Sequence, residues 1–154
     1  LGAEQIFDQI AESKNLEVKN ARRRENIHKH IDKYVTQELK TWSVDIKARK
    51  KTSRSDSDAQ DEWIWIEFQN VRGNLGWLYG EADNIAFETQ DSFVIVDRKS
   101  LIDYVENAVD MAKPVRKSYL AKYKTYQRAG RNDLLTMVEL SKIIENCKHF
   151  VWQK

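Results

Sequence analysis

The chain has 154 residues, with 26 Lys or Arg, 24 Asp or Glu and a formal net charge of +2. This length is typical of one domain with a sizeable core, and five Trp, six Tyr and five Phe supply large apolar side chains for it. No run approaches the roughly 20 apolar residues of a membrane span, and the lone Cys147 excludes a disulfide within the chain and a cysteine-rich zinc site. We therefore expect a cytoplasmic protein with no signal peptide and no membrane partner.

Charged residues are segregated along the chain. Residues 14–54 contain thirteen Lys or Arg and five Asp or Glu, whereas residues 55–112 contain three and thirteen. Residues 113–131 contain seven Lys or Arg and no acid. Basic segments around an acidic middle favour a nucleic-acid enzyme, in which the cations hold phosphates and the acids hold a metal ion. Ordinary solvated surface charge is the alternative interpretation.

The first forty residues predict two helices. Residues 3–14 place apolar side chains on one side of a helix, and we expect residues 1–18 to form an N-terminal helical appendage. Residues 20–40 predict the clearest helix, because apolar residues recur at helical spacing from Ile27 to Leu39.

Residues 42–49 and 62–71 predict the two strands of a hairpin. The segment 50–61 between them is polar and has no apolar anchor, so we expect a mobile tip there. On the first strand, Asp45 and Lys47 alternate with apolar residues and therefore share one face.

The second half of the chain alternates strands and helices, and the order of elements predicts a mixed α+β class. We expect residues 19–154 to form a single domain. The predicted strands lie near 84–87 and at 92–97, 117–128 and 134–140, and the predicted helices lie at 100–113, ended by Pro114, and at 141–148.

The most informative segment is WIWIEFQNVRG, residues 63–73. Glu67 and Gln69 lie two positions apart, so they share one face of an otherwise apolar strand. A carboxylate in such a run is costly unless it is paired or binds a cation. Since the expected hairpin presents Asp45 and Glu67 to the same place, the two acids predict a site for a hard divalent ion such as Mg²⁺.

These features resemble the PD-(D/E)xK nucleases, the restriction-endonuclease-like superfamily, over roughly residues 20–140. The resemblance rests on a helix, a strand with Asp45 and a strand with Glu67-x-Gln69, where Gln69 stands in place of the usual Lys. The segments GWLYGEADNIAFE and FVIVDRKSL are similar to the part of such domains that follows the active strand. Within the superfamily the chain most resembles small phage-encoded nucleases, and YQRAGRNDLLTMV adds to that resemblance. The implied fold is a restriction-endonuclease-like core with a central mixed sheet of about four to five strands flanked by helices.

The resemblance implies metal-dependent hydrolysis of DNA phosphodiester bonds. One or two Mg²⁺ or Mn²⁺ ions lower the pKa of the attacking water and offset the charge that grows on the phosphate. Gln69 or Lys47 would orient that water. The implied metal ligands are Asp45, Glu67 and the backbone carbonyl of Phe68. The candidate catalytic residues are Asp45, Glu67, Gln69, Lys47 and, on the preceding helix, Glu25.

Five basic residues are candidates for phosphate binding. Lys50, Lys51 and Arg54 belong to the expected mobile tip, and Arg128 and Arg131 belong to a cationic turn. Charge-assisted contacts from such side chains suit phosphate oxygens. DNA is the expected partner, and RNA and a homodimer stay open. If the chain is phage-encoded, the expected compartment is the bacterial host cytoplasm.

Two alternatives stay open. Asp83, Asp97 and Lys99 have the literal D…DxK form on the third and fourth predicted strands, and they compete with Asp45 and Glu67 for the active site. The alternative function is a catalytically inactive nuclease-fold module that binds nucleic acid, which the Gln in place of Lys favours. An acidic interaction protein that mimics a phosphate backbone is a further hypothesis.

Overall fold

The computed structural model describes residues 1–56 and 58–154, so Ser57 of the expected mobile tip lies outside the described residues. The chain divides into two compact units. The first contains Leu1–Arg49, Gly80–Lys99 and Lys148–Lys154, and the second contains Lys50–Tyr79 and Ser100–Cys147. The mixed α+β class is confirmed. Among the described residues, no helix has the length and apolarity needed to cross a bilayer.

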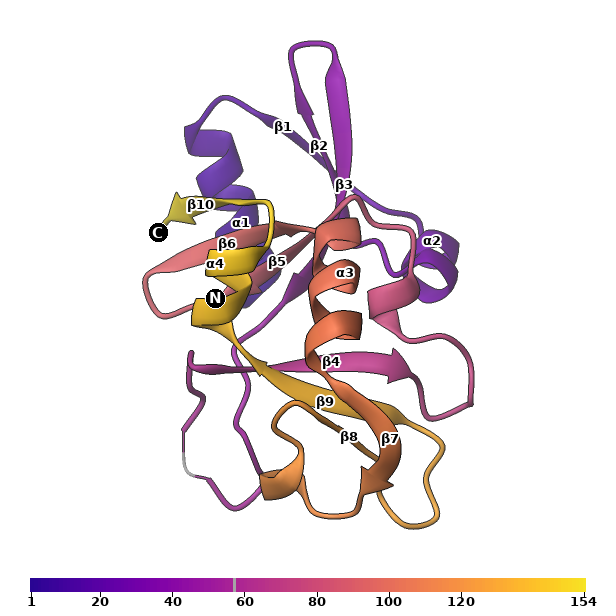
Figure 1. The fold of residues 1–154 in the computed structure, drawn as a ribbon. Helices are drawn as coiled ribbons and strands as arrows, with labels where there is room; N and C mark the ends of the chain where they lie inside the picture. The colour runs from indigo at the N-terminus through magenta and orange to yellow at the C-terminus, as the bar shows by residue number, and fades with distance from the viewer. Residues whose placement is uncertain (57) are drawn as a thin grey trace. The chain divides into compact units, whose positions relative to one another are not determined.

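The first unit is built on a six-stranded mixed sheet with strand order β1-β2-β3-β5-β6-β10 (Figure 1). Its pairs are antiparallel except for β3 and β5, which run parallel. The elements are α1 (Ala3–Ser13), β1 (Glu17–Asn20), α2 (Arg23–Lys29), β2 (Lys33–Gln37), β3 (Lys40–Lys47), β5 (Asn84–Glu88), β6 (Ser92–Asp97) and β10 (His149–Gln153).

Helix α1 forms part of the core of this unit. Phe7 is fully buried, and its ring packs against Phe93 at 5.5 Å and Trp152 at 5.0 Å between centroids. Val44 and Ile46 of β3 belong to the same apolar cluster. Burying a side chain such as Phe7 stabilises a fold by about 1.5–3 kcal/mol. Residues 1–18 are therefore an integral part of the unit rather than an appendage.

The helix expected over residues 20–40 is wrong in its second half. Helix α2 ends at His30, whose φ of 54° is left-handed. Strand β2 begins at Lys33, and a turn with Glu38 at φ 57° leads into β3. Tyr34, Val35 and Thr36 are aromatic or β-branched residues that suit a strand, and pairing with β3 overrides the helical spacing.

The hairpin expected between residues 42–49 and 62–71 is also wrong. Strand β3 pairs with β2 on one edge and with β5 on the other, so neither edge is left for β4 (Trp63–Gln69). Strand β4 pairs instead with β9 (Leu134–Glu139) in the sheet of the second unit. Asp45 and Glu67 consequently belong to different sheets and different units.

The second unit contains a four-stranded sheet with order β4-β9-β8-β7. Strand β7 (Asp110–Val115) begins within the helix expected at 100–113, and the shorter strand β8 (Lys124–Tyr126) lies in the region where one strand was expected at 117–128. Pro114 lies in the edge strand β7, where its missing N–H is tolerated, and not at the end of a helix. The helices of this part of the chain are α3 (Arg98–Ala108), η1 (Trp77–Tyr79), η2 (Ser118–Leu120) and α4 (Leu140–Asn146). Sheets of six and four strands thus replace the expected sheet of four to five.

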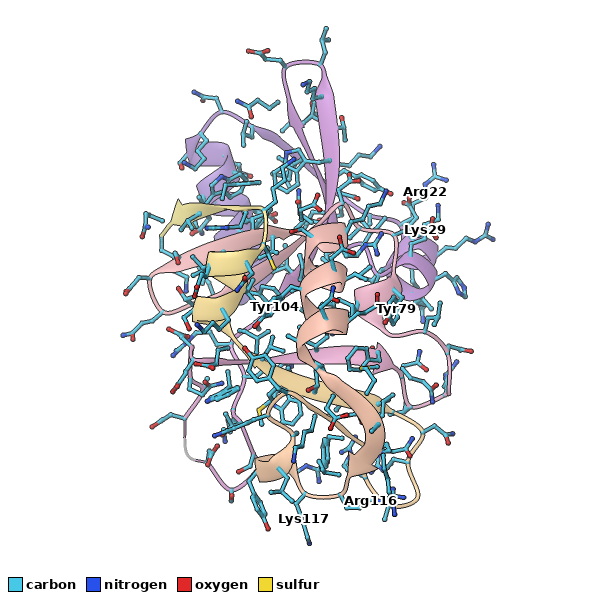
Figure 2. All side chains as sticks on the ribbon, viewed as in Figure 1. Arg22, Lys29, Tyr79, Tyr104, Arg116 and Lys117 are labelled. Carbon is cyan, nitrogen blue, oxygen red and sulfur yellow. The ribbon has the colours of Figure 1, made fainter. Side chains whose placement is uncertain are left out.

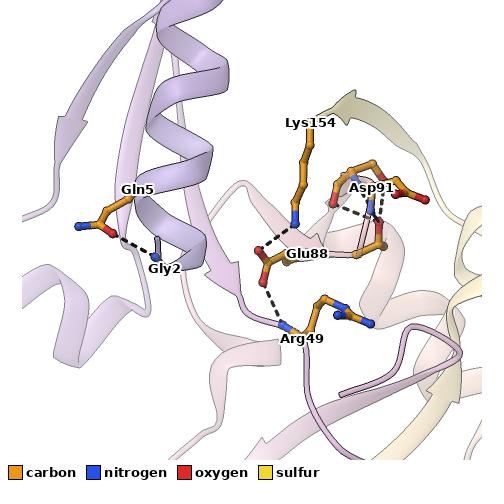
Figure 3. Close-up of polar contacts among 8 residues, drawn as sticks. Gly2, Gln5, Arg49, Glu88, Asp91 and Lys154 are labelled. Atoms are coloured by element: carbon orange, nitrogen blue, oxygen red, sulfur yellow. Dashed lines mark hydrogen bonds and ion pairs between the residues drawn. The ribbon is translucent and has the colours of Figure 1, made fainter. Parts of the chain in front are cut away.

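The C-terminal strand β10, which the sequence did not predict, pairs with β6 at the edge of the first sheet. Just beyond it, Lys154 Nζ lies 3.1 Å from Glu88 Oε2. The other carboxylate oxygen of Glu88 accepts a hydrogen bond from the backbone N–H of Arg49 at 3.3 Å (Figure 3). One carboxylate therefore ties the chain end to the segment that follows β3.

Candidate active site

Asp45 and Lys47 lie on the face of β3 that is opposite α1. The residues that alternate with them, Val44 and Ile46, belong to the apolar cluster under α1, so the two charged side chains point the other way. Asp45 is only 4 % exposed, and its Oδ1 lies 3.1 Å from the Lys47 ammonium. The predicted proximity of Asp45 and Lys47 is confirmed.

Asp32, which the sequence analysis did not identify, brings a second carboxylate to the same place. It stands directly before β2, and its backbone N–H donates to the Val44 carbonyl at 2.8 Å. Its Oδ2 accepts from the backbone N–H of Ile46 at 2.7 Å, and its Oδ1 accepts from Asn26 Nδ2 at 2.7 Å. These bonds hold Asp32 beside Asp45, where the start of β2 meets the end of β3.

The nearby positive charge does not offset the cost of burying the Asp45 carboxylate. Burial, the largest cause, raises the pKa of Asp45 to about 7. The Lys47 ammonium opposes this rise, whereas the Asp32 carboxylate adds to it. Within the described residues, Asp45 Oδ2 is buried and has no hydrogen-bond donor. Two such close carboxylates either share a proton or need a cation.

The donors present here fit a hard divalent ion that is bound by few protein ligands. Mg²⁺ usually keeps several waters and uses one or two carboxylates together with substrate phosphates. Asp32 and Asp45 supply two carboxylates, and the buried Asp45 Oδ2 is available to a cation. In the described part of the chain, no group of three or more His, Cys, Asp or Glu could hold a metal ion. An ion held by Asp32 and Asp45 would need further ligands besides these two carboxylates.

Glu67 has a structural setting in the second unit. Its Oε1 accepts a hydrogen bond from the Trp77 backbone N–H at 3.3 Å. Gly76 packs so tightly on it that a Cβ at position 76 would lie 2.4 Å from the Glu67 carbonyl oxygen. Since β3 and β4 do not pair, the strand contact that was expected to join Glu67 to Asp45 is absent.

The neighbours of Glu67 are likewise engaged within the second unit. Gln69 Nε2 donates to the Asn132 carbonyl at 2.6 Å. The Phe68 carbonyl, expected to bind metal, accepts a hydrogen bond from the Gly76 N–H at 2.8 Å. These contacts explain the polar residues of β4 through local hydrogen bonding.

Glu25 lies on α2 and binds β2. One oxygen accepts from the Tyr34 hydroxyl, and the other accepts from the Arg22 backbone N–H at 3.1 Å. The bond from Tyr34 is the main reason why the pKa of Glu25 is lowered, and the same bond raises the pKa of Tyr34 to about 12. Glu25 is therefore an ionised anchor between α2 and β2.

The five basic residues predicted to bind phosphate differ in their surroundings. Lys50, Lys51, Arg54 and Arg131 are exposed. Arg128 instead forms an ion pair with Asp133 at 2.6 Å. Asp133 is only 4 % exposed, so Arg128 compensates a buried acid.

The competing hairpin is present, because β5 and β6 pair with Asn84 opposite Asp97. Asp83 Oδ2 accepts from both the backbone N–H and the hydroxyl of Ser43, at 2.8 and 3.2 Å. The Ser43 hydroxyl in turn accepts from the Asp83 N–H at 2.9 Å. Asp83 therefore joins β5 to β3, and Lys99 is exposed on α3.

The sequence does carry a signal for the site that the structure assembles. Asp45-Ile46-Lys47 is a literal DxK motif, and Asp32 precedes Asp45 by thirteen residues. Treating Tyr34–Thr36 as a strand would have placed Asp32 at the start of a hairpin partner. No protein-family model, no curated protein and no solved structure matches the chain.

Proposed function

We propose that the chain is a metal-dependent nuclease that hydrolyses DNA phosphodiester bonds at Asp32, Asp45 and Lys47. The observation that carries this proposal is the buried Asp45 carboxylate, which has an oxygen without a donor and a second carboxylate beside it. On this proposal, the D…DxK set of a restriction-endonuclease-like core lies on the β2–β3 hairpin. Asp32 then takes the place that the sequence analysis assigned to Glu67.

The residues divide the work between metal binding and phosphate chemistry. Asp32 and Asp45 would hold Mg²⁺ or Mn²⁺, which when bound would activate water and offset the charge on the phosphate. Lys47 Nζ lies 3.1 Å from Asp45 Oδ1 and is 27 % exposed, so its ammonium can reach substrate oxygens as well. A cation in that position stabilises charge that develops in the transition state.

Isosteric variants test this assignment. Plasmid DNA is incubated with Mg²⁺ or Mn²⁺ and with the wild type, Asp32→Asn, Asp45→Asn or Glu67→Gln. We expect Asp32→Asn and Asp45→Asn to lose at least about 100-fold in cleavage rate, while Glu67→Gln retains it. Equal cleavage by the wild type and Asp45→Asn rejects the site. If Glu67→Gln loses cleavage while Asp32→Asn keeps full activity, the metal site is the pair of Asp45 and Glu67 that the sequence predicted.

A second candidate function is DNA binding without cleavage. It is favoured by the small number of carboxylates. Among the residues that the structure describes, Asp32 and Asp45 are the two that meet at this place, and the Lys47 ammonium already pairs with Asp45. Salt-dependent DNA binding with no cleavage in either metal would support this function.

A further inference from the structure

A groove of about 670 Å³ lies in the first unit, where β1, α2 and the β2–β3 hairpin line it. Positive charge dominates the lining, with four Lys or Arg against two Glu and with His28 in addition. The charged lining residues are Lys19, Arg22, Arg24, Lys29, Glu17 and Glu25.

This groove opens on the face of the sheet that carries Asp45. Thr41 and Tyr34 line it, and β3 continues from Thr41 through Ser43 to Asp45 on the same face. Four residues of strand span about 13 Å at roughly 3.3 Å each. That length equals about four base steps of a B-form strand at roughly 3.4 Å. The groove therefore ends only a few nucleotide steps along β3 from Asp45.

Three of the four cations that line the groove are exposed and form no ion pair with an acid in the described part of the chain. Arg22, Arg24 and Lys29 are exposed, and in the part of the chain that the structure describes none of them lies within 4.0 Å of an acid as a salt bridge. Figure 2 labels Arg22, which directly precedes α2, and Lys29, the last residue of α2. Of the two acids, Glu25 already accepts bonds from the Tyr34 hydroxyl and a backbone N–H.

Helix α2 is fixed in place and is tied to the candidate active site. The Lys29 carbonyl accepts from the Glu81 N–H at 2.8 Å, and Gly80 packs so closely that a Cβ there would lie 2.8 Å from the same carbonyl. Asn26 of the same helix donates to Asp32 Oδ1 at 2.7 Å. The wall that carries the cations thus also holds one of the two candidate metal ligands.

We propose that this groove binds the phosphate backbone of the DNA strand that is cleaved at Asp32 and Asp45. The inference rests on the proposed function and adds the surface that positions the substrate. Lys and Arg contacts to phosphates give affinity without sequence information, and that affinity falls with salt. The groove therefore predicts sequence-tolerant binding, with cleavage a few nucleotides from the contacted phosphates.

The test measures binding apart from cleavage. Anisotropy of a short fluorescent DNA duplex is followed in EDTA between about 50 and 200 mM NaCl. The groove variant Arg24→Ala with Lys29→Ala is compared with Arg23→Ala with Lys40→Ala, which removes two exposed cations that do not line the groove. Loss of two phosphate contacts should reduce the slope of log K against log salt by about 1.8. The affinity change over this salt range then becomes about tenfold smaller, while the control behaves as the wild type.

The outcomes separate the groove from the chemistry. Asp45→Asn should bind DNA as well as the wild type and fail to cleave it. If the groove variant binds DNA as tightly as the wild type, the proposed role of the groove is wrong, even if Asp45→Asn abolishes cleavage. If the wild type never cleaves DNA but the groove variant binds it more weakly than the wild type does, the groove is supported and the nuclease function is rejected.

Two further arms complete the design. Single-stranded DNA and an RNA duplex of the same sequence identify the form of backbone, and failure of the wild type to bind any of them overturns the inference. Circular dichroism and thermal unfolding check the fold of each variant. If the double variant does not fold, Lys19→Glu on β1 reverses the charge of the opposite wall and should weaken binding at least tenfold.

Discussion

Replacing Asp45 by Asn should stabilise the folded chain while it abolishes the proposed activity. The pKa of Asp45 rises from an ordinary 3.8 to about 7, mainly because the carboxylate is buried. Each tenfold change in proton affinity corresponds to about 1.4 kcal/mol, so the ionised carboxylate lowers the free energy of unfolding by roughly 4 kcal/mol above pH 7. Asn keeps the shape of the side chain and carries no charge.

The sign of the pH dependence follows from proton binding. Between pH 3.8 and about 7 the folded state holds a proton on Asp45 that the unfolded state releases. The protonated Asp45 therefore contributes to the free energy of unfolding of the wild type at low pH, and this contribution is lost as pH rises through about 7. The advantage of Asp45→Asn over the wild type should grow from roughly 2 kcal/mol at pH 5 to roughly 4 kcal/mol at pH 8.

Urea unfolding, followed by tryptophan fluorescence at pH 5 and pH 8 without divalent metal, measures both values. Asp91→Asn is the matched control, since Asp91 is exposed in a turn of the same unit (Figure 3) and should change stability little at either pH. An Asp45→Asn variant that is less stable than the wild type at pH 8 would refute the reasoning. So would an advantage that is equal at the two pH values.

Three further predictions concern the metal and the packing. Mn²⁺ at about ten times its dissociation constant should raise wild-type stability at pH 8 by about 1.4 kcal/mol, with no effect on Asp45→Asn in the same thermal-shift assay. Lys33→Ala should cost about 2–3 kcal/mol in urea unfolding, because Lys33 is 6 % exposed and lies 3.0 Å from the Asp8 carboxylate, which would lose its cation. Gly76→Ala should cost at least about 2 kcal/mol, because its Cβ would lie 2.4 Å from the Glu67 carbonyl oxygen.

Each packing prediction has a control in the same chain. Gly73 has φ +83° and open space around it, so Gly73→Ala should cost only about 1 kcal/mol of backbone strain. Lys40 is exposed, and Lys40→Ala should change stability by less than about 0.5 kcal/mol. If Gly76→Ala lowers the free energy of unfolding no more than Gly73→Ala does, Gly76 does not pack closely on Glu67. A mild Lys33→Ala would show that Asp8 reaches water.

Local patterns were sufficient for much of the secondary structure. The apolar side of α1 and the apolar runs of β5, β6 and β9 were predicted in place, because their periodicity and composition agree with the tertiary structure. The spacing from Ile27 to Leu39 failed, because a two-turn helix followed by a strand produces nearly the same spacing as one long helix. That error concealed β2 and with it the position of Asp32.

The pairing of strands was the part that the sequence could not supply. Strands β3 and β4 follow each other in the chain, yet they do not pair. Strand β3 pairs with β2 across a short turn and, in parallel, with β5, which lies much further along the chain. Asp45 could be singled out alone, since an acid in an apolar strand is unusual whatever its neighbours. Its partner Asp32 depends on the antiparallel register that places Lys33 opposite Val44.

The physical argument for a cation at Asp45 does not depend on the resemblance to any family. The attraction of Lys47 is already included in the balance that leaves the pKa of Asp45 at about 7. One ammonium at 3.1 Å therefore does not restore an ordinary carboxylate, since burial and the Asp32 charge outweigh it. A neutral side chain at position 45 would make the fold more stable, so stability does not account for an acid there. A divalent ion between Asp32 and Asp45 would supply the missing positive charge, and the cost in stability would then be the expected trade-off of an active site.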